Sequence, residues 1–130
     1  TWRCSEKKSL KYVIDNLDKL VVKEVHGSGG YGMLIGPTSS KKEIENFKQK
    51  LISKPSNYIA QPTLSLSSVP ILTKNGLAPR HVDLRPFALM SPNDIKITNG
   101  GLSRVALKEN SLLVNSSQGG GTKDTWIVDK

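Results

Sequence analysis

A cluster of glycines at residues 27–32 restricts the fold of this chain more than any other feature. It separates two short β-prone apolar runs, residues 20–25 and 31–35. The glycines match the spacing G-x-G-x-x-G, but a dinucleotide-binding fold needs a helix after them, and a strand-like run follows instead. A P-loop would need Gly-Lys-Ser or Gly-Lys-Thr at its end, which is absent. The sequence therefore predicts a flap made of a strand, a glycine loop and a second strand.

A glycine loop of this kind can bind an anion. Its backbone N–H groups can approach a phosphate closely because no side chain intervenes. Lys23, just ahead of the loop, supplies a positive charge for the same anion. The candidate ligands are therefore Lys23 and the loop residues Gly27, Ser28, Gly29, Gly30, Tyr31 and Gly32. The alternative is a flexible hairpin with a surface lysine.

Two helices are predicted around this flap. Apolar residues at helical spacing predict a helix over residues 6–19. Ser40 and Glu43 form a capping-box pattern, and the helix that they begin is predicted to stop near Pro55. Residues 57–61 are then predicted to be a buried strand that ends at Pro62.

The second half of the sequence predicts an antiparallel meander. Its strands are expected at residues 80–90, 95–98, 102–107 and 112–114, with Gly and Asn turns between them. A Ser- and Pro-rich stretch at 63–79 gives no clear pattern, and the glycine-rich residues 118–123 are predicted to be a flexible loop. The fold class is therefore α+β, an antiparallel sheet with two main helices on one side.

Length, charge and cysteine content limit the class of protein. A chain of 130 residues fits one domain, residues 1–130, and the formal charge of +8 implies an anionic partner. That partner could be a polyphosphate such as ATP or a nucleic acid, although lysines scattered over helix faces would give the same charge. The lone Cys4 excludes an internal disulfide and suits the cytoplasm, and no apolar run approaches the ~20 residues of a membrane span. The chain starts at Thr1 without Met, which we interpret as a cut end.

A row of charged residues lies on one predicted strand. Strand alternation places His81, Asp83 and Arg85 on one face. The opposite face, with Val82 and Leu84, is expected to meet a core. Asp83 can orient Arg85, which can then hold a carboxylate or a phosphate through two hydrogen bonds. We expect this row to point into the same cleft as Lys23. The alternative is a solvent-facing strand with a salt bridge.

Two more polar residues follow at the next strands. Arg104 lies in the middle of a predicted strand, where an uncompensated charge is costly, so a partner is expected. Asn115 ends the strand after it and opens the glycine-rich stretch. The alternatives are a turn residue for Asn115 and a linker for the glycines.

In this order, these features resemble the ATP-clamping part of ATP-grasp enzymes, and the whole chain is similar to the circularly permuted ATP-grasp family. The matching runs are LDKLVVK, YIAQP, APRHVDLRPF and VNSSQGGGTKDTW, at residues 17–23, 58–62, 78–87 and 114–126. They span nearly the whole chain. The resemblance implies that residues 1–130 are the C-terminal, ATP-clamping part of a longer protein.

The resemblance also implies how ATP would be bound. Lys23 would contact the α- and β-phosphates, and the glycine loop would cover the triphosphate. The backbone around Gln61 would line the adenine pocket. His81 and Asp83 would belong to the same nucleotide site.

The reaction implied by the resemblance is the joining of a carboxylate to an amine through an acyl phosphate. Arg85 and Arg104 would stabilise the transferred phosphoryl group, and Asn115 would order that end of the site. Such catalysis is mostly positioning and charge neutralisation. The partners would be ATP, a carboxylate substrate and an amine acceptor.

One departure from the family concerns the metal. ATP-grasp enzymes hold Mg²⁺ with acidic residues in a Glu-x-Asn pattern, and no such pattern occurs in this chain. We expect the metal carboxylates in the N-terminal remainder of the same protein. Among the acids present, Asp83, Asp124 and Glu24 can approach the phosphates.

The predicted function is therefore the ATP-binding portion of an ATP-dependent, peptide-bond-forming ligase. The alternative is a non-catalytic basic module that binds a nucleotide or a nucleic acid. Single-stranded nucleic acids usually stack on aromatic side chains, and the chain has only two Trp, three Tyr and two Phe. This composition favours ATP over nucleic acid, and no membrane partner is expected.

Overall fold

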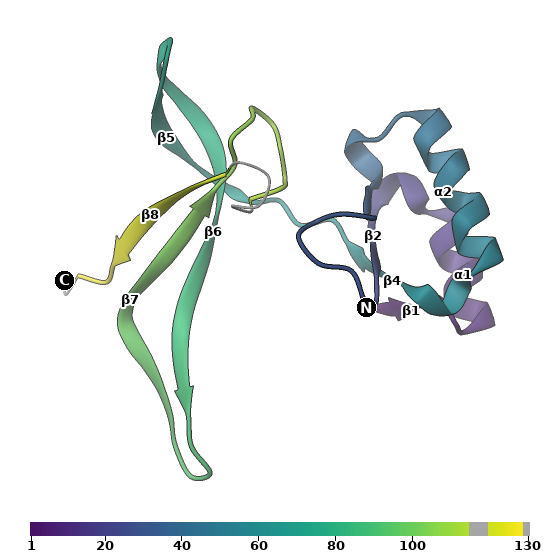
Figure 1. Ribbon diagram of the computed structural model, residues 1–130, viewed down its shortest axis with the longest axis horizontal. Helices are drawn as coiled ribbons and strands as arrows, with labels where there is room; N and C mark the ends of the chain where they lie inside the picture. The colour runs from purple at the N-terminus through teal and green to yellow at the C-terminus, as the bar shows by residue number, and fades with distance from the viewer. Residues whose placement is uncertain (115–119, 129–130) are drawn as a thin grey trace. The chain divides into compact units, whose positions relative to one another are not determined.

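The chain folds into two compact units, residues 1–65 and 66–130 (Figure 1). The computed structural model describes residues 1–114 and 120–128. The boundary between the units lies in the Ser- and Pro-rich stretch that gives no clear sequence pattern. Whether residues 1–130 act as one domain of a longer protein stays a prediction. No helix in the described ranges is long and apolar enough to cross a membrane.

The first unit is a small antiparallel sheet with helices packed on one face. Its elements are β1 (Trp2–Arg3), α1 (Lys7–Asp15), η1 (Leu17–Lys19), β2 (Leu20–Glu24), β3 (Leu34–Ile35), η2 (Gly36–Thr38), α2 (Lys41–Ser53), η3 (Pro55–Asn57) and β4 (Tyr58–Pro62). The strand order is β1-β4-β2-β3. Figure 1 shows α1 and α2 side by side against this sheet. For this unit the predicted α+β class is confirmed.

The core of this unit lies between the helices and one sheet face. Val13 of α1 and Leu51 of α2 are fully buried together with Val22 of β2 and Ala60 of β4. Burial alternates along β2 and β4, so every second side chain points away from the helices. The face away from the core is therefore available for polar side chains.

Local sequence signals account for the helix boundaries. The Ser40 hydroxyl accepts a hydrogen bond from the Glu43 amide, and the Glu43 carboxylate accepts one from the Ser40 amide at 2.7 Å. This is the predicted capping box, and α2 ends at Ser53, ahead of Pro55. The helix predicted over residues 6–19 is instead α1 followed by the separate 3-10 turn η1.

The second unit is a four-stranded antiparallel meander. Its strands are β5 (Ser67–Thr73), β6 (Gly76–Met90), β7 (Ile95–Val105) and β8 (Gly121–Trp126), in the order β5-β6-β7-β8. Figure 1 shows β6 and β7 as one long hairpin. The predicted meander is therefore confirmed. Pro86 lies beside an irregularity in the β6–β7 pairing, which is where a central strand can accept a proline.

Three details of the predicted meander are wrong. The two strands expected at 95–98 and 102–107 are one continuous strand, since pairing with β6 and β8 supports the residues between them. Residues 112–114 form no strand. Residues 121–123, expected in a flexible loop, pair with β7 as the start of β8. In the first and third of these places, long-range pairing outweighs the local preference of glycine.

Candidate functional site

Two predicted nucleotide ligands, Lys23 and Gln61, meet on the exposed face of the first sheet. The β2–β4 register pairs Lys23 with Ile59 and Val21 with Gln61, which places Lys23 and Gln61 on one face in diagonal positions. The Lys23 ammonium donates a hydrogen bond of 2.8 Å to Oε1 of Gln61. Nε2 of Gln61 donates in turn to the Thr1 hydroxyl at 3.1 Å.

The glycine loop closes beside this pair. Three of its glycines adopt left-handed φ values: Gly29 at 67°, Gly30 at 76° and Gly32 at 69°. The strand predicted at residues 31–35 is therefore too long, because the turn continues through Gly32 and β3 begins at Leu34. The predicted order of strand, glycine loop and strand is otherwise present, with a very short second strand.

A small cavity lies between the loop and the end of β2. Its volume is about 110 Å³, and it is lined by Lys23, Glu24, Gly27, Ser28, Gly30, Tyr31, Met33 and Ile59. Five of these residues are predicted phosphate ligands. The cavity is small for a whole nucleotide and suits a single phosphate group. Lys23 and the glycine-rich backbone of this lining suit a phosphate group, whereas the Glu24 carboxylate in the same lining would repel one.

Glu24 has a larger part in this site than its sequence position suggests. A Cβ atom added to Gly32 would lie 2.7 Å from Cδ of Glu24, and one added to Gly27 would lie 3.0 Å from Cβ of Glu24. The loop is thus folded around this side chain. Burial and the Glu24 charge, in that order, raise the pKa of Tyr58, which pairs with Glu24 across the sheet. The sequence did hold a signal for this role: Glu24 follows Leu20 and Val22 at two-residue spacing, so an acid occupies a position of β2 that faces the core side.

In the second unit, Asp83 and Arg85 form a two-point ion pair. Nη2 of Arg85 lies 2.8 Å from Oδ2 of Asp83, and Nε of Arg85 donates to Oδ1 at 3.1 Å. The hydrogen bond and then the charge of Asp83 raise the pKa of Arg85. The predicted pairing of Asp83 with Arg85 is present, and it also fits the alternative of a solvent-facing strand with a salt bridge. Because the two side chains bond each other, they also share a face of β6.

The strand register adds Arg104 and Asp124 to this charged face. Asp83 is paired directly with Arg104 on β7, and Arg85 is paired with Leu102. Leu102 is paired with Asp124 on β8. Directly paired residues of antiparallel strands project to the same side. Sequence alternation along single strands could not show this grouping, because the register between strands determines it.

His81 lies at the start of this row. Its Nδ1 is 3.2 Å from the Leu66 carbonyl, so this nitrogen carries the proton in that contact. The opposite face was expected to meet a core, but Leu84 is 56% exposed. The structure describes the two units separately, so a common cleft for Lys23 and Arg85 stays a prediction. Asn115 lies outside the described residues.

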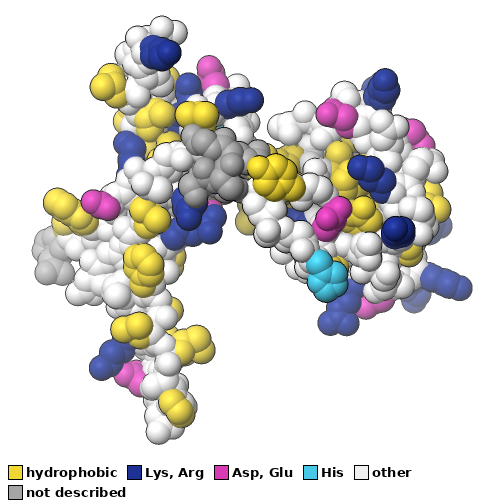
Figure 2. All heavy atoms as spheres, in the orientation of Figure 1, with side chains coloured by type: hydrophobic (Ala, Val, Ile, Leu, Met, Phe, Trp, Pro, Cys, Tyr) yellow, Lys and Arg dark blue, Asp and Glu magenta, His cyan; other side chains and the backbone are white. Residues whose placement is uncertain are grey.

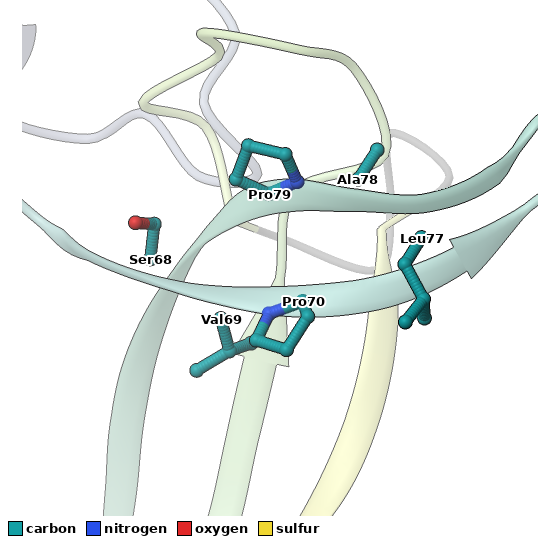
Figure 3. Close-up of a pocket in the computed structure, with 6 residues that line it drawn as sticks. All are labelled: Ser68, Val69, Pro70, Leu77, Ala78 and Pro79. Atoms are coloured by element: carbon teal, nitrogen blue, oxygen red, sulfur yellow. The ribbon is translucent and has the colours of Figure 1, made fainter.

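A second hollow, on the β5–β6 hairpin, differs chemically from the loop cavity. Figure 3 shows its lining, which consists of Ser68, Val69, Pro70, Leu77, Ala78 and Pro79. Its volume is about 210 Å³, and no charged side chain lines it. This hollow offers nothing to neutralise a phosphate, whereas Lys23 lines the loop cavity.

The residues described do not fit a magnesium centre. Within residues 1–114 and 120–128, no group of three or more His, Cys, Asp or Glu side chains is placed to hold a metal ion. The carboxylate of Asp83 is already paired with the guanidinium of Arg85. Mg²⁺ requires several oxygen ligands in near-octahedral geometry. No step of a reaction is therefore assigned to a metal held by this chain.

Comparison with known proteins gives one family and a group of relatives. The model of the circularly permuted ATP-grasp type 2 family matches residues 1–106. An uncharacterized protein of Synechocystis is 50% identical over 128 residues, which are 98% of this chain and 27% of the relative. An uncharacterized protein of Mycobacterium tuberculosis is 49% identical, again over 98% of this chain but 23% of its own length. A Frankia casuarinae protein, named as a candidate glutamate–cysteine ligase, is 42% identical over 98% of this chain and 14% of its own length.

Proposed function

The chain belongs to the circularly permuted ATP-grasp type 2 family, and on that premise we propose that it is the ATP-binding portion of a carboxylate–amine ligase. The observation that carries the proposal is the cavity that Lys23 lines together with residues of the glycine loop. The name of the Frankia relative, a ligase that would join a carboxylate to an amine, supports the same reaction class. The chain spans 27% of the Synechocystis relative, so the activity of a whole protein lies beyond these residues.

In this proposal the first unit holds the triphosphate. Lys23 contacts the α- and β-phosphates, and the residues of the glycine loop donate backbone N–H groups to the phosphate oxygens. The backbone near Gln61 lines the adenine pocket. The left-handed turns at Gly29, Gly30 and Gly32 support this role, because they let successive amides converge without side chains between them.

The charged face of the second unit supplies the groups for phosphoryl transfer. A carboxylate oxygen of the substrate attacks the γ-phosphorus, the bond to the β-phosphate oxygen breaks, and ADP leaves. Arg85 and Arg104 neutralise charge on the transferred phosphoryl group, with Arg85 aligned by Asp83. His81 completes the nucleotide side of this face.

The second step makes the amide bond. The amine nitrogen attacks the acyl carbon, the bond from that carbon to the phosphate oxygen breaks, and inorganic phosphate leaves as the amine loses a proton. The same arginines hold the departing phosphate. Metal carboxylates for Mg²⁺ are proposed to lie in the remainder of a longer protein, together with the carboxylate and amine pockets.

The exposed apolar surface of the second unit supports a contact with such a remainder. Met90, Ile95 and Ile97 are 78%, 62% and 64% exposed, and the register places Met90 opposite Ile95. Figure 2 shows hydrophobic side chains along this long hairpin. Contiguous exposed apolar patches often mark sites of interaction with another protein surface. We propose that another part of the longer protein packs on this surface.

The test is nucleotide binding by Lys23 variants, measured by calorimetry. Lys23→Ala is expected to weaken ATP binding by roughly 1–3 kcal/mol, the range for a hydrogen bond to a charged group. Lys48→Ala, which removes a partly buried lysine of α2 instead, should leave the affinity unchanged. Equal ATP affinity in the Lys23 variant and the unsubstituted chain would refute the proposed site. Tighter binding of RNA than of ATP would favour a nucleic-acid-binding module.

A further inference from the structure

We propose that Gln61 is a positioning residue that holds the Lys23 ammonium in place for the phosphates. This inference rests on the proposed function and assigns the Gln61 side chain a task separate from the adenine pocket. The contact is short, with Nζ of Lys23 2.8 Å from Oε1 of Gln61. It joins residues 38 positions apart in the sequence, so the fold and not local sequence creates it.

The orientation of the Gln61 amide follows from elementary chemistry. An ammonium can only donate hydrogen bonds, so the amide oxygen must face Lys23. The amide nitrogen then faces the other way, where it lies 3.1 Å from the Thr1 hydroxyl. Both ends of the amide are therefore occupied. The side chain is held between two partners and can restrain the flexible lysine stem.

The position of Gln61 agrees with action through Lys23. Lys23 and Ile59 line the loop cavity, but Gln61 is not among its lining residues. Gln61 is half-buried on the sheet face away from the core, one strand from Lys23. Gln61 would therefore affect a phosphate in the cavity indirectly, through its hydrogen bond to Lys23.

A neutral amide is the suitable partner for this task. Gln61 accepts a hydrogen bond from the ammonium without cancelling its charge, so Lys23 keeps its attraction for an anion. A carboxylate at the same place would form an ion pair with Lys23 and compete with the phosphate. A side chain of similar shape without polar atoms would leave the lysine mobile. Gln61→Glu introduces the carboxylate, and Gln61→Met introduces the side chain without hydrogen-bonding groups of its own kind.

The experiment is titration calorimetry on the 130-residue chain with two separate probes, inorganic tripolyphosphate and adenosine. Gln61→Met is expected to weaken tripolyphosphate binding about fivefold, the scale of one net hydrogen bond, and to leave adenosine binding unchanged. Gln61→Glu should weaken tripolyphosphate binding further. Gln49→Met on α2 is the matched control, since Gln49 bonds only a neighbouring helix residue, and it should change neither affinity.

A double-mutant cycle separates positioning from a structural role. In a Lys23→Ala background, Gln61→Met should have no further effect on tripolyphosphate affinity, because no ammonium remains to be positioned. A further loss in that background, or weaker adenosine binding by Gln61→Met, would overturn the inference and leave the proposed function standing. If Lys23→Ala itself leaves tripolyphosphate binding unchanged, or the unsubstituted chain binds no tripolyphosphate, the proposed function fails and the inference fails with it.

Discussion

At the scale of single residues, two glycines of the first unit are required for different reasons. A Cβ on Gly36 would lie 1.9 Å from the carbonyl oxygen of Leu17, which is backbone and cannot move away easily. A Cβ on Gly32 would meet only the flexible end of Glu24, so most of the cost there comes from its left-handed φ of 69°. The close approach of two backbone segments therefore makes Gly36 the more sensitive position.

We predict that Gly36→Ala destabilises the chain by about 3 kcal/mol, the upper part of the range for overpacking. Gly32→Ala, the matched control, should cost about 1–2 kcal/mol, the usual cost of a left-handed alanine. Urea unfolding followed by circular dichroism measures both. A smaller loss for Gly36→Ala than for Gly32→Ala would show that the contact between η1 and η2 is looser than described.

At the scale of elements, the start of α2 depends on the ionisation of Glu43. The Ser40 side chain and then the Ser40 amide lower the pKa of Glu43, because both donate to its charged form. A carboxyl group whose pKa is lowered in the folded state stabilises the fold above its unfolded pKa. That contribution is lost as the pH falls through the folded pKa.

The prediction is a loss of stability on the acid side that depends on Ser40. Ser40→Ala should lower the urea midpoint at neutral pH. It should also make the midpoint fall less steeply from neutral to acid pH, since Glu43 then loses the larger of the two hydrogen bonds that lower its pKa. Glu45→Gln is the control, because Glu45 makes only surface contacts within α2, with Lys48 at 3.9 Å and with Gln49 at 3.2 Å. An acid dependence equally steep in Ser40→Ala and in the unsubstituted chain would contradict the capping interaction.

At the scale of the whole molecule, we expect this chain to bind ATP without catalysing transfer of its γ-phosphate. Lys23, the glycine loop and the Asp83–Arg85 pair are all present in this chain, whereas the described residues include no acidic cluster for Mg²⁺. Metal ions bridge the phosphate oxygens in phosphoryl transfer from ATP. The chain should therefore fold and bind ATP weakly without hydrolysing or transferring its γ-phosphate.

The corresponding measurement compares ADP release by the 130-residue chain and by a protein of the relatives' length that contains it. Only the longer protein is expected to release ADP with Mg²⁺ and a panel of amino acids and peptides. The longer protein carrying Lys23→Ala serves as the control for nucleotide-dependent turnover. Comparable metal-dependent rates from the short and long proteins would place the metal site within these residues and refute the proposed division of roles.

The sequence by itself determined the local elements and the chemistry of the loop. The capping box at Ser40, the glycine turns and the apolar spacing of α2 act between residues close in sequence, so each was readable without a structure. The alternation along β6 likewise indicated that Asp83 could align Arg85. The meander was also predictable in outline, because turn residues separate its strands.

Only the tertiary structure decided which distant residues meet. The β2–β4 register brings Gln61 to Lys23, and the β6–β7 register brings Arg104 opposite Asp83. A shift of one residue would reverse the faces in either pair, and nothing within a single strand determines that register. The same pairing made residues 121–123 a strand where glycine alone predicts a loop. Backbone hydrogen bonds between distant strands, which local sequence does not encode, are the physical reason.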